Sequence, residues 1–309
     1  MSQKYPINRE FFPFTHFAAP INPRVFDAAR KFMGVPKFVW RDPDLIVGTL
    51  VVPGYREGEI EVLIVMPRGL SAPAPCLIDF HGGGFVFEAA WYQYRFAMHY
   101  AKQARCIVAL VRYRLAPAFP FPYPQEDCYS AARWIHECAD ELGIDRSRIG
   151  FCGDSAGGTL TATSCMMLRD RNAQLEPLFQ LLIYPWLDNR YESESYRKFT
   201  DVPMWNSSKT QLVSPLINPN PAATPLAYRS PVEAESFAGL PPAYIEVAEF
   251  DSLHDDGVLY AQLLRDAGIS VELHETSGTI HGFDAKTKAP TTQQMLAKRV
   301  GFMKRMFGK

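Results

Sequence analysis

Short apolar runs alternate with amphipathic stretches along most of the chain. The runs are apolar on both faces, which is typical of buried strands, and they fall at residues 76–81, 106–113, 148–153, 179–185, 242–250 and 271–275. The stretches between and after them have the spacing of helices and fall at residues 89–104, 125–143, 155–170, 258–268 and 291–307. This alternation predicts an α/β fold whose mostly parallel sheet is covered by helices on both faces.

Two further strand patterns precede this series. Residues 45–53 read "LIVGTLVVP" and residues 58–67 read "GEIEVLIVMP". In the second stretch, one face carries Ile60, Val62, Ile64 and Met66, and the other carries Glu61, Leu63 and Val65. A Pro-Gly pair and a charged loop separate the two stretches, so we expect an antiparallel pair. The sequence therefore predicts an eight-stranded sheet.

Two regions depart from the alternation. Residues 1–44 mix prolines and aromatics with one helical candidate at 23–33, and residues 187–242 are long, polar and rich in proline. Loops of that length in a compact domain usually carry function. We expect an N-terminal cap segment at 1–44 and a main domain at 45–309 with a cap insertion at about 187–225, the two together forming a lid over a site.

Composition and charge narrow the class of protein. The chain has 309 residues, 47% of them hydrophobic, and a formal net charge of −1, so no global field favours nucleic acid or an anionic membrane. The six cysteines form no Cys-x-x-Cys pair, which indicates reduced core thiols and neither a metal nor a cofactor. No signal peptide or membrane-spanning stretch is recognisable. We expect a cytoplasmic protein; monomer and homodimer both remain open.

The stretch "GDSAGG" places Ser155 where a predicted strand becomes a helix. Gly153-x-Ser155-x-Gly157 has the spacing of a nucleophile elbow, in which glycines permit a tight turn that raises the serine above the sheet. The N–H of Ala156, at the helix start, is placed to donate to an oxyanion. A glycine-rich turn or a phosphate-binding loop explains the stretch equally well when it is taken alone.

A second glycine-rich stretch, "HGGGF" at residues 81–85, follows the predicted strand at 76–81. Consecutive glycines leave the backbone N–H groups of Gly83 and Gly84 unhindered by side chains, which suits a loop that must approach a substrate oxygen. A flexible loop is the plain alternative. The combination with the elbow two strands later is far more specific than either motif.

A base and an acid for Ser155 both follow it in the chain. Asp251 directly follows the predicted strand at 242–250, and His281 lies a few residues after the last predicted strand, where the carboxyl ends of parallel strands converge. Ser155 would attack an acyl carbon, His281 would move its proton and Asp251 would orient the imidazole. Asp255 and Asp256 compete for the acid role, although capping of the next helix explains them as well.

Other histidines have weaker contexts, and chain order excludes one rival class. His254 shares the loop of Asp251, and the remaining histidines lack a glycine-rich or strand-end setting: His16, His99, His136 and His274. In chymotrypsin-like proteases the histidine and aspartate precede the serine in an all-β fold, the reverse of what is found here. A non-catalytic ligand-binding protein of the same fold and an acyltransferase remain open.

Taken together, these motifs resemble those of the bacterial hormone-sensitive-lipase-like esterases and lipases of the α/β-hydrolase fold. The resemblance spans roughly residues 45–309 and rests on "HGGGF", "YRLAP", "PFP", "GDSAGG", "GLPPAYIEVAEFDSLHDDG" and "IHGF", in that order. It implies Ser155, Asp251 and His281 as the catalytic triad. It also implies Gly83, Gly84 and Ala156 as oxyanion donors, no cofactor, and a small-molecule ester as substrate.

The chain departs from the family pattern outside these residues. Ala118 stands where the family usually has glutamate, and Glu88 stands where a small residue is usual. Phe85, Trp186 and Trp205 are candidates to line a substrate pocket. We expect hydrolysis of short-chain, acetyl-type esters, because bulky Trp186 would shorten the acyl pocket.

Overall fold

The computed structural model describes residues 4–12, 26, 35–220, 222–223 and 225–308. The predicted helix at 23–33 lies outside these residues except for Phe26. The predicted cap segment at 1–44 is therefore described only in part.

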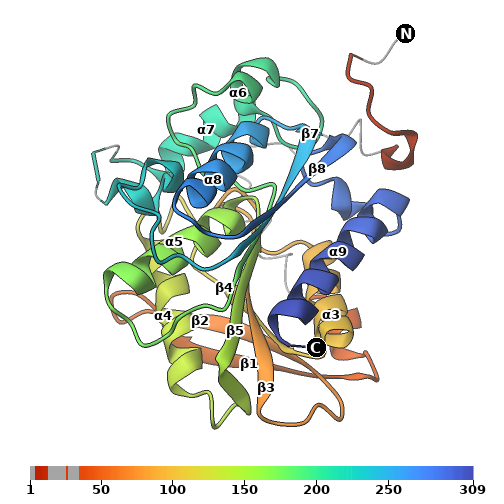
Figure 1. The fold of residues 1–309 in the computed structure, drawn as a ribbon, viewed down its shortest axis with the longest axis vertical. Helices are drawn as coiled ribbons and strands as arrows, with labels where there is room; N and C mark the ends of the chain where they lie inside the picture. Colours follow the sequence, from red (N-terminus) through yellow and green to blue (C-terminus); the bar gives the residue numbers. More distant parts are fainter. Residues whose placement is uncertain (1–3, 13–25, 27–34, 221, 224, 309) are drawn as a thin grey trace.

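One sheet organises the molecule (Figure 1). Its eight strands run in the spatial order β1-β2-β4-β3-β5-β6-β7-β8. Their bounds are Leu45–Pro53, Glu59–Pro67, Ala74–Phe80, Ile107–Arg112, Ile144–Asp154, Gln180–Ile183, Ala243–Phe250 and Val271–Ile280, for β1 to β8. Strand β2 pairs antiparallel with β1 and β4, and the other pairings are parallel. The predicted eight-stranded, mostly parallel sheet is confirmed.

Helices cover both faces of the sheet. Helices α4, α5 and α8 lie on one side, and α3 and α9 lie on the other (Figure 1). Their bounds are Trp91–Ala104 for α3, Tyr123–Glu137 for α4, Ala156–Asp170 for α5, His254–Asp266 for α8 and Pro290–Met306 for α9. The short helix α2, Lys37–Trp40, precedes β1.

Two apolar layers fill the space between the sheet and its helices. Cys76, Ile78 and Phe80 on β3 point into the layer beneath α4 and α5, whereas Leu77 points into the layer beneath α3 and α9. This alternation follows from the two-residue period of a strand. Because both faces are buried, the inner strands are apolar throughout, which is why they could be recognised in the sequence.

Two element ends differ from the prediction by five residues or more. Strand β8 runs five residues beyond the predicted end, from Val271 to Ile280, because its second half pairs with β7 around an irregularity between Ala248 and Phe250. That half reads "TSGTI" and lacks an apolar pattern. Helix α4 ends at Glu137, and the chain then turns before β5.

The segment between β6 and β7 contains two helices, α6 (Glu194–Lys198) and α7 (Ser207–Ile217). Side chains cap both helices: Ser193 accepts the N–H of Tyr196, and Asn206 accepts the N–H of Lys209. Two 3-10 turns follow, at Leu226–Tyr228 and Pro231–Glu233. Helices α6 and α7 lie at the end of the molecule where β7 and β8 finish (Figure 1).

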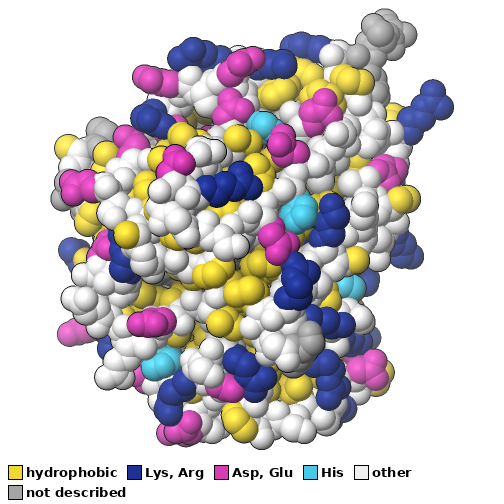
Figure 2. All heavy atoms as spheres, in the orientation of Figure 1, with side chains coloured by type: hydrophobic (Ala, Val, Ile, Leu, Met, Phe, Trp, Pro, Cys, Tyr) yellow, Lys and Arg dark blue, Asp and Glu magenta, His cyan; other side chains and the backbone are white. Residues whose placement is uncertain are grey.

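Surface features are consistent with the small net charge. Acidic and basic side chains both occur across the face shown in Figure 2. Among the described residues, every helix is too short or too polar to cross a lipid bilayer. Five of the six cysteines are buried in the core.

Candidate active site

Ser155 lies in a strained turn between β5 and α5. Its backbone has φ 55° and ψ −117°, a conformation that residues with a side chain seldom adopt. Three neighbouring segments meet there at distances that only glycine tolerates. A Cβ at Gly157 would lie 1.8 Å from the carbonyl oxygen of Phe80, and one at Gly153 would lie 2.2 Å from the carbonyl oxygen of Gly157. The glycines therefore hold Ser155 against the end of β3.

Ser155, His281 and Asp251 form a continuous hydrogen-bonded chain. The Nε2 atom of His281 lies 2.9 Å from Oγ of Ser155, and its Nδ1 atom lies 2.7 Å from Oδ2 of Asp251. Oδ1 of Asp251 also accepts the N–H of Leu253 at 3.0 Å, which fixes the carboxylate. Asp251 is fully buried, and Ser155 and His281 are 6% and 7% exposed. These three hydrogen-bonded side chains are shielded from most of the solvent, and the series ends at Oγ of Ser155.

The glycine loop at 81–85 is tied to the elbow by Asp154. Oδ1 of Asp154 accepts the N–H of Gly82 at 2.8 Å and an N–H of the Gln93 side chain at 2.8 Å. Burial raises the pKa of Asp154 to about 6, and the charge of Asp284 adds to the effect. Asp154, adjacent to Ser155, thus stabilises the loop that passes over the elbow.

The orientation of two loop amides is fixed by the carbonyls that precede them. The carbonyl of Gly82 lies 2.7 Å from Nδ1 of His81, and the carbonyl of Gly83 accepts the N–H of Phe87 at 2.9 Å. In a trans peptide the N–H points opposite to the carbonyl. The N–H groups of Gly83 and Gly84 therefore point away from these partners.

The amide of Ala156 is fixed in the same way. The carbonyl of Ser155 accepts the N–H of Gly158 at 2.9 Å and that of Trp186 at 3.2 Å. The N–H of Ala156 points away from them, at the first residue of α5. The positive end of the helix dipole adds to its strength as a donor.

A buried polar network, absent from the sequence prediction, lies beneath the imidazole. The ring of Tyr184 packs on His281 with centroids 4.7 Å apart, and its hydroxyl donates to Asp284 at 2.6 Å. Arg299, fully buried, bonds both Asp284 and Glu246. These residues come from four separated parts of the chain, so no local motif signals the network.

The three aromatic residues predicted to line a pocket lie together beside the hydrogen-bonded side chains of the site. The rings of Trp186 and Trp205 are 6.1 Å apart, and Phe85 lies 6.0 Å from Trp186. Trp205 comes from the segment between α6 and α7 and lies 6.3 Å from His281. A Cβ at Gly84 would lie 2.7 Å from the Trp205 ring. The insertion thus brings an aromatic wall to the glycine loop.

The competing acid and base candidates have other partners. His254 lies between Asp255, at 2.9 Å, and Glu275, at 3.2 Å. Oδ2 of buried Asp256 accepts the N–H groups of Leu187 and Asp188 at 2.9 and 3.0 Å. Asp256 therefore anchors the start of the insertion, a role that differs from the helix capping considered from the sequence.

His99 and His136 lie on α3 and α4, as the sequence predicted. His274 lies on β8 and packs on Tyr244 with centroids 4.6 Å apart. His16 lies outside the described residues.

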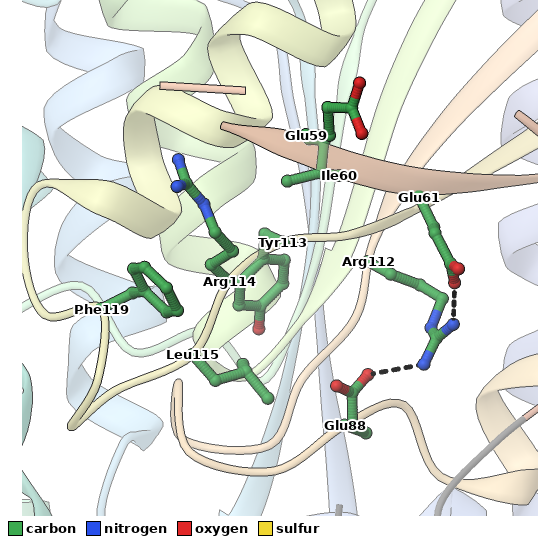
Figure 3. Close-up of a pocket in the computed structure, with 9 residues that line it drawn as sticks. All are labelled: Glu59, Ile60, Glu61, Glu88, Arg112, Tyr113, Arg114, Leu115 and Phe119. Atoms are coloured by element: carbon green, nitrogen blue, oxygen red, sulfur yellow. Dashed lines mark hydrogen bonds and ion pairs between the residues drawn. The ribbon is translucent and has the colours of Figure 1, made fainter. Parts of the chain in front are cut away.

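The unusual Glu88 lines a charged cavity (Figure 3). Arg112 lies between Glu61 and Glu88, with its guanidinium 3.4 Å from Glu88. The cavity has a volume of about 310 Å³ and opens between β2 and the segment that follows β4. Glu88 thus forms an ion pair with Arg112 at the end of β4 and does not belong to the hydrogen-bonded side chains of the site.

The sheet is mostly parallel and has helices on both faces. Together with a glycine loop, a serine in a tight strand-to-helix turn and a histidine at the strand ends, it defines the α/β-hydrolase class. Comparison with known proteins agrees. Residues 77–285 match a family model described as the alpha/beta hydrolase fold. The chain is 37% identical to esterase LipI of Mycobacterium tuberculosis over 78% of this chain and 76% of the relative. It is 36% identical to carboxylesterase NlhH of the same species over 73% and 71%.

Solved structures extend the likeness to nearly the whole chain. A bacterial heroin esterase superposes with a TM-score of 0.89 at 31% identity, covering 99% of both chains. Esterase LipW of Mycobacterium marinum superposes with a TM-score of 0.89 at 27% identity, covering 98% of this chain and 96% of the other. The chain belongs to the hormone-sensitive-lipase-like esterases of the α/β-hydrolase fold. It is a carboxylic ester hydrolase.

Proposed function

We propose that this hydrolase cleaves esters through an acyl-enzyme on Ser155. The observation that carries the proposal is the buried chain from Ser155 through His281 to Asp251, at 2.9 and 2.7 Å. His281 takes the hydroxyl proton as Ser155 attacks the ester carbonyl, and returns it to the leaving alcohol. Water then attacks the acyl-enzyme with His281 again as base. Asp251 orients the imidazole and stabilises its positive charge.

The N–H groups of Gly83, Gly84 and Ala156 stabilise the negative oxygen that forms in each step. Their preceding carbonyls are held on the opposite side, so the three donors are oriented before the substrate arrives. Such preorganised donors are typically worth about 3 kcal/mol each in the transition state. Asp154 supports them indirectly, because it bonds Gly82 of the same loop.

The substrate is a short-chain ester of the acetyl type. The clustered rings of Phe85, Trp186 and Trp205 support this, because they leave little room beside His281 for a long acyl chain. A relative from Pseudomonas putida that is 32% identical to this chain is named ethyl acetate hydrolase. Both observations favour a small acyl group.

The insertion and the N-terminal segment act together as a cap. Asp201 of the insertion accepts hydrogen bonds from Lys4 at 2.7 Å and from Tyr5 at 2.6 Å. Trp205 follows four residues later and reaches His281. The contact between Tyr5 and Asp201 thus links the start of the described chain to the aromatic wall.

A p-nitrophenyl ester series tests this function. We expect kcat/KM to fall from acetate to octanoate, and Ser155→Ala to lose at least a thousandfold in kcat. Equal slow rates for both proteins would mean a non-catalytic binding protein. Product analysis with added alcohol separates hydrolysis from acyl transfer, because transfer would yield a new ester in place of the free acid.

A further inference from the structure

A small polar cavity lies next to the aromatic wall. Its lining includes Phe85, Thr159, Trp186, Gln125 and Asn218. These residues come from the glycine loop, α5, the end of β6, α4 and the end of α7, so the cavity lies where the insertion meets the main domain. The space open to the centre of a water-sized sphere is about 10 Å³, which suits a single small group.

Three polar atoms around this cavity are buried without a hydrogen-bond partner within the described part of the chain. They are Nε1 of Trp186, Oε1 of Gln125 and Oδ1 of Asn218. Gln125 and Trp186 are each only 2% exposed. A buried polar atom without a partner costs about 1–3 kcal/mol, so three around one cavity indicate a bound group that satisfies them.

The chemistry of the three atoms specifies that group. Trp186 offers an N–H donor, whereas Gln125 and Asn218 each offer an acceptor. The group must both donate and accept, as a water or a hydroxyl does. Asn189 and Arg229 complete the polar lining of the cavity. An ammonium group would face the indole N–H and the guanidinium, neither of which accepts a hydrogen bond.

The cavity is connected to the elbow through short contacts. The N–H of Trp186 donates to the carbonyl of Ser155 at 3.2 Å, and the hydroxyl of Thr159 donates to the carbonyl of Trp186. Thr159 lies one helical turn after Ser155 on α5, and Phe85 adjoins Gly84 of the glycine loop. Phe85 and Trp186 also belong to the aromatic wall whose third ring, Trp205, lies 6.3 Å from His281, so the cavity adjoins the site of Ser155 and His281.

We propose that the cavity is a specificity subsite for a hydroxyl group on the acyl chain of the substrate. This inference rests on the proposed function, because it requires the acyl group to be attached at Ser155. The preferred substrates are short hydroxyacyl esters, whose hydroxyl accepts from Trp186 and donates to Gln125 or Asn218. Water satisfies the same atoms when an unsubstituted acyl group is bound.

Ratios of kcat/KM for matched ethyl esters, measured by pH-stat, test the subsite. The pairs are ethyl 3-hydroxybutyrate with ethyl butyrate, and ethyl lactate with ethyl propionate. The wild-type ratio of hydroxy to unsubstituted ester, for the better pair, is expected to fall about tenfold in Gln125→Met and in Asn218→Leu. Comparing ratios between proteins cancels the intrinsic reactivity of each ester. Ethyl acetoacetate, which only accepts, is expected to show no such fall.

The control is Ser164→Ala on the same helix α5. It removes a buried hydroxyl that has no hydrogen-bond partner among the described residues and does not line the cavity. Its ratios should equal those of the wild type. Equal ratios in all four proteins would overturn the subsite and leave a cavity for water only. If Asn218→Leu does not fold, Gln125→Met decides the question. Retained activity in Ser155→Ala would instead refute the proposed function.

Discussion

The turn at Ser155 and the insertion between β6 and β7 are held in place by different kinds of contact. The turn is fixed by backbone against backbone, with Gly157 packed on the carbonyl of Phe80. The insertion is attached through carboxylate side chains of the main domain. Asp256 accepts two backbone N–H groups at its start, and Asp255 accepts the N–H of Ser195 at 2.8 Å.

This difference separates the chemistry from the choice of substrate. A backbone contact at van der Waals distance tolerates no added atom, so the elbow has one geometry. Side-chain anchors can be replaced one at a time, each at modest cost. We therefore expect changes at the elbow to abolish folding or activity, whereas changes at the insertion should alter which ester the enzyme accepts.

The largest effect is expected from Gly157→Ala. The added methyl would lie 1.8 Å from the carbonyl oxygen of Phe80, so β3 and α5 would have to separate. We expect destabilisation by more than about 4 kcal/mol, or no folded protein, in urea unfolding. Gly301→Ala on α9 is the matched control. Its nearest neighbour would lie at 3.7 Å, and the helix should gain about 0.5–1 kcal/mol. A folded Gly157→Ala protein of wild-type stability would contradict the account.

Next in size is a pH effect at Asp79, on β3 beneath the glycine loop. Burial raises the pKa of this carboxyl to about 8, and the charge of Asp154 adds to the effect. A raised folded-state pKa gives stability that is complete below the unfolded value and is lost as pH rises through the folded value. Asp79→Asn should therefore match the wild type near pH 4. Its advantage should then grow by up to about 1.4 kcal/mol per pH unit towards pH 8.

Urea unfolding of both proteins at several pH values measures this gap. A constant difference from pH 4 to pH 8 would mean that Asp79 does not titrate as its burial implies. Because Asp79 belongs to the main domain, the acyl-length preference of Asp79→Asn should remain that of the wild type.

A smaller effect is expected at the anchor of the insertion. Asp256→Ala leaves the N–H groups of Leu187 and Asp188 without their acceptor, at a cost of about 1–3 kcal/mol. Asp256→Asn retains an acceptor oxygen and should stay close to the wild type. The p-nitrophenyl series should show a shift in acyl preference for Asp256→Ala alone. An unchanged preference in both variants would break the link between the insertion and specificity.

The smallest effect is expected at Asp201. Its partners Lys4 and Tyr5 are reached at the surface, where salt and water weaken such contacts. Asp201→Ala should leave Tm within measurement error, with faster proteolysis of the segment at 187–225 as its only sign. A fall in Tm as large as that of Asp256→Ala would show that the N-terminal segment stabilises the fold.

The main domain could be predicted from the sequence because its strands are buried on both faces. Their apolar runs make the strands recognisable in the sequence. Ser155, Asp251 and His281 could then be selected as candidates because each lies near the end of one of these strands. Strand β8 was predicted too short because its second half carries no such run. Its true end places His281 directly after the strand.

Contacts between distant side chains could not be predicted. Tyr184, Asp284 and Arg299 are each unremarkable in the sequence, and only the packing of α9 against the sheet brings them together beneath His281. Asp256 followed a helix-capping pattern, yet its partners lie in the insertion. A single sequence shows neither which side chains are buried nor which residues far apart in the chain form hydrogen bonds with one another.

Covalent labelling is the most direct test of whether Ser155 is the nucleophile. The purified protein would be treated with diethyl p-nitrophenyl phosphate and examined by intact-mass and peptide mass spectrometry. We expect one diethylphosphoryl group per chain, on the peptide that contains Ser155, with complete loss of esterase activity and no label in Ser155→Ala. Label on another residue, or full esterase activity in a fully labelled protein, would contradict this expectation.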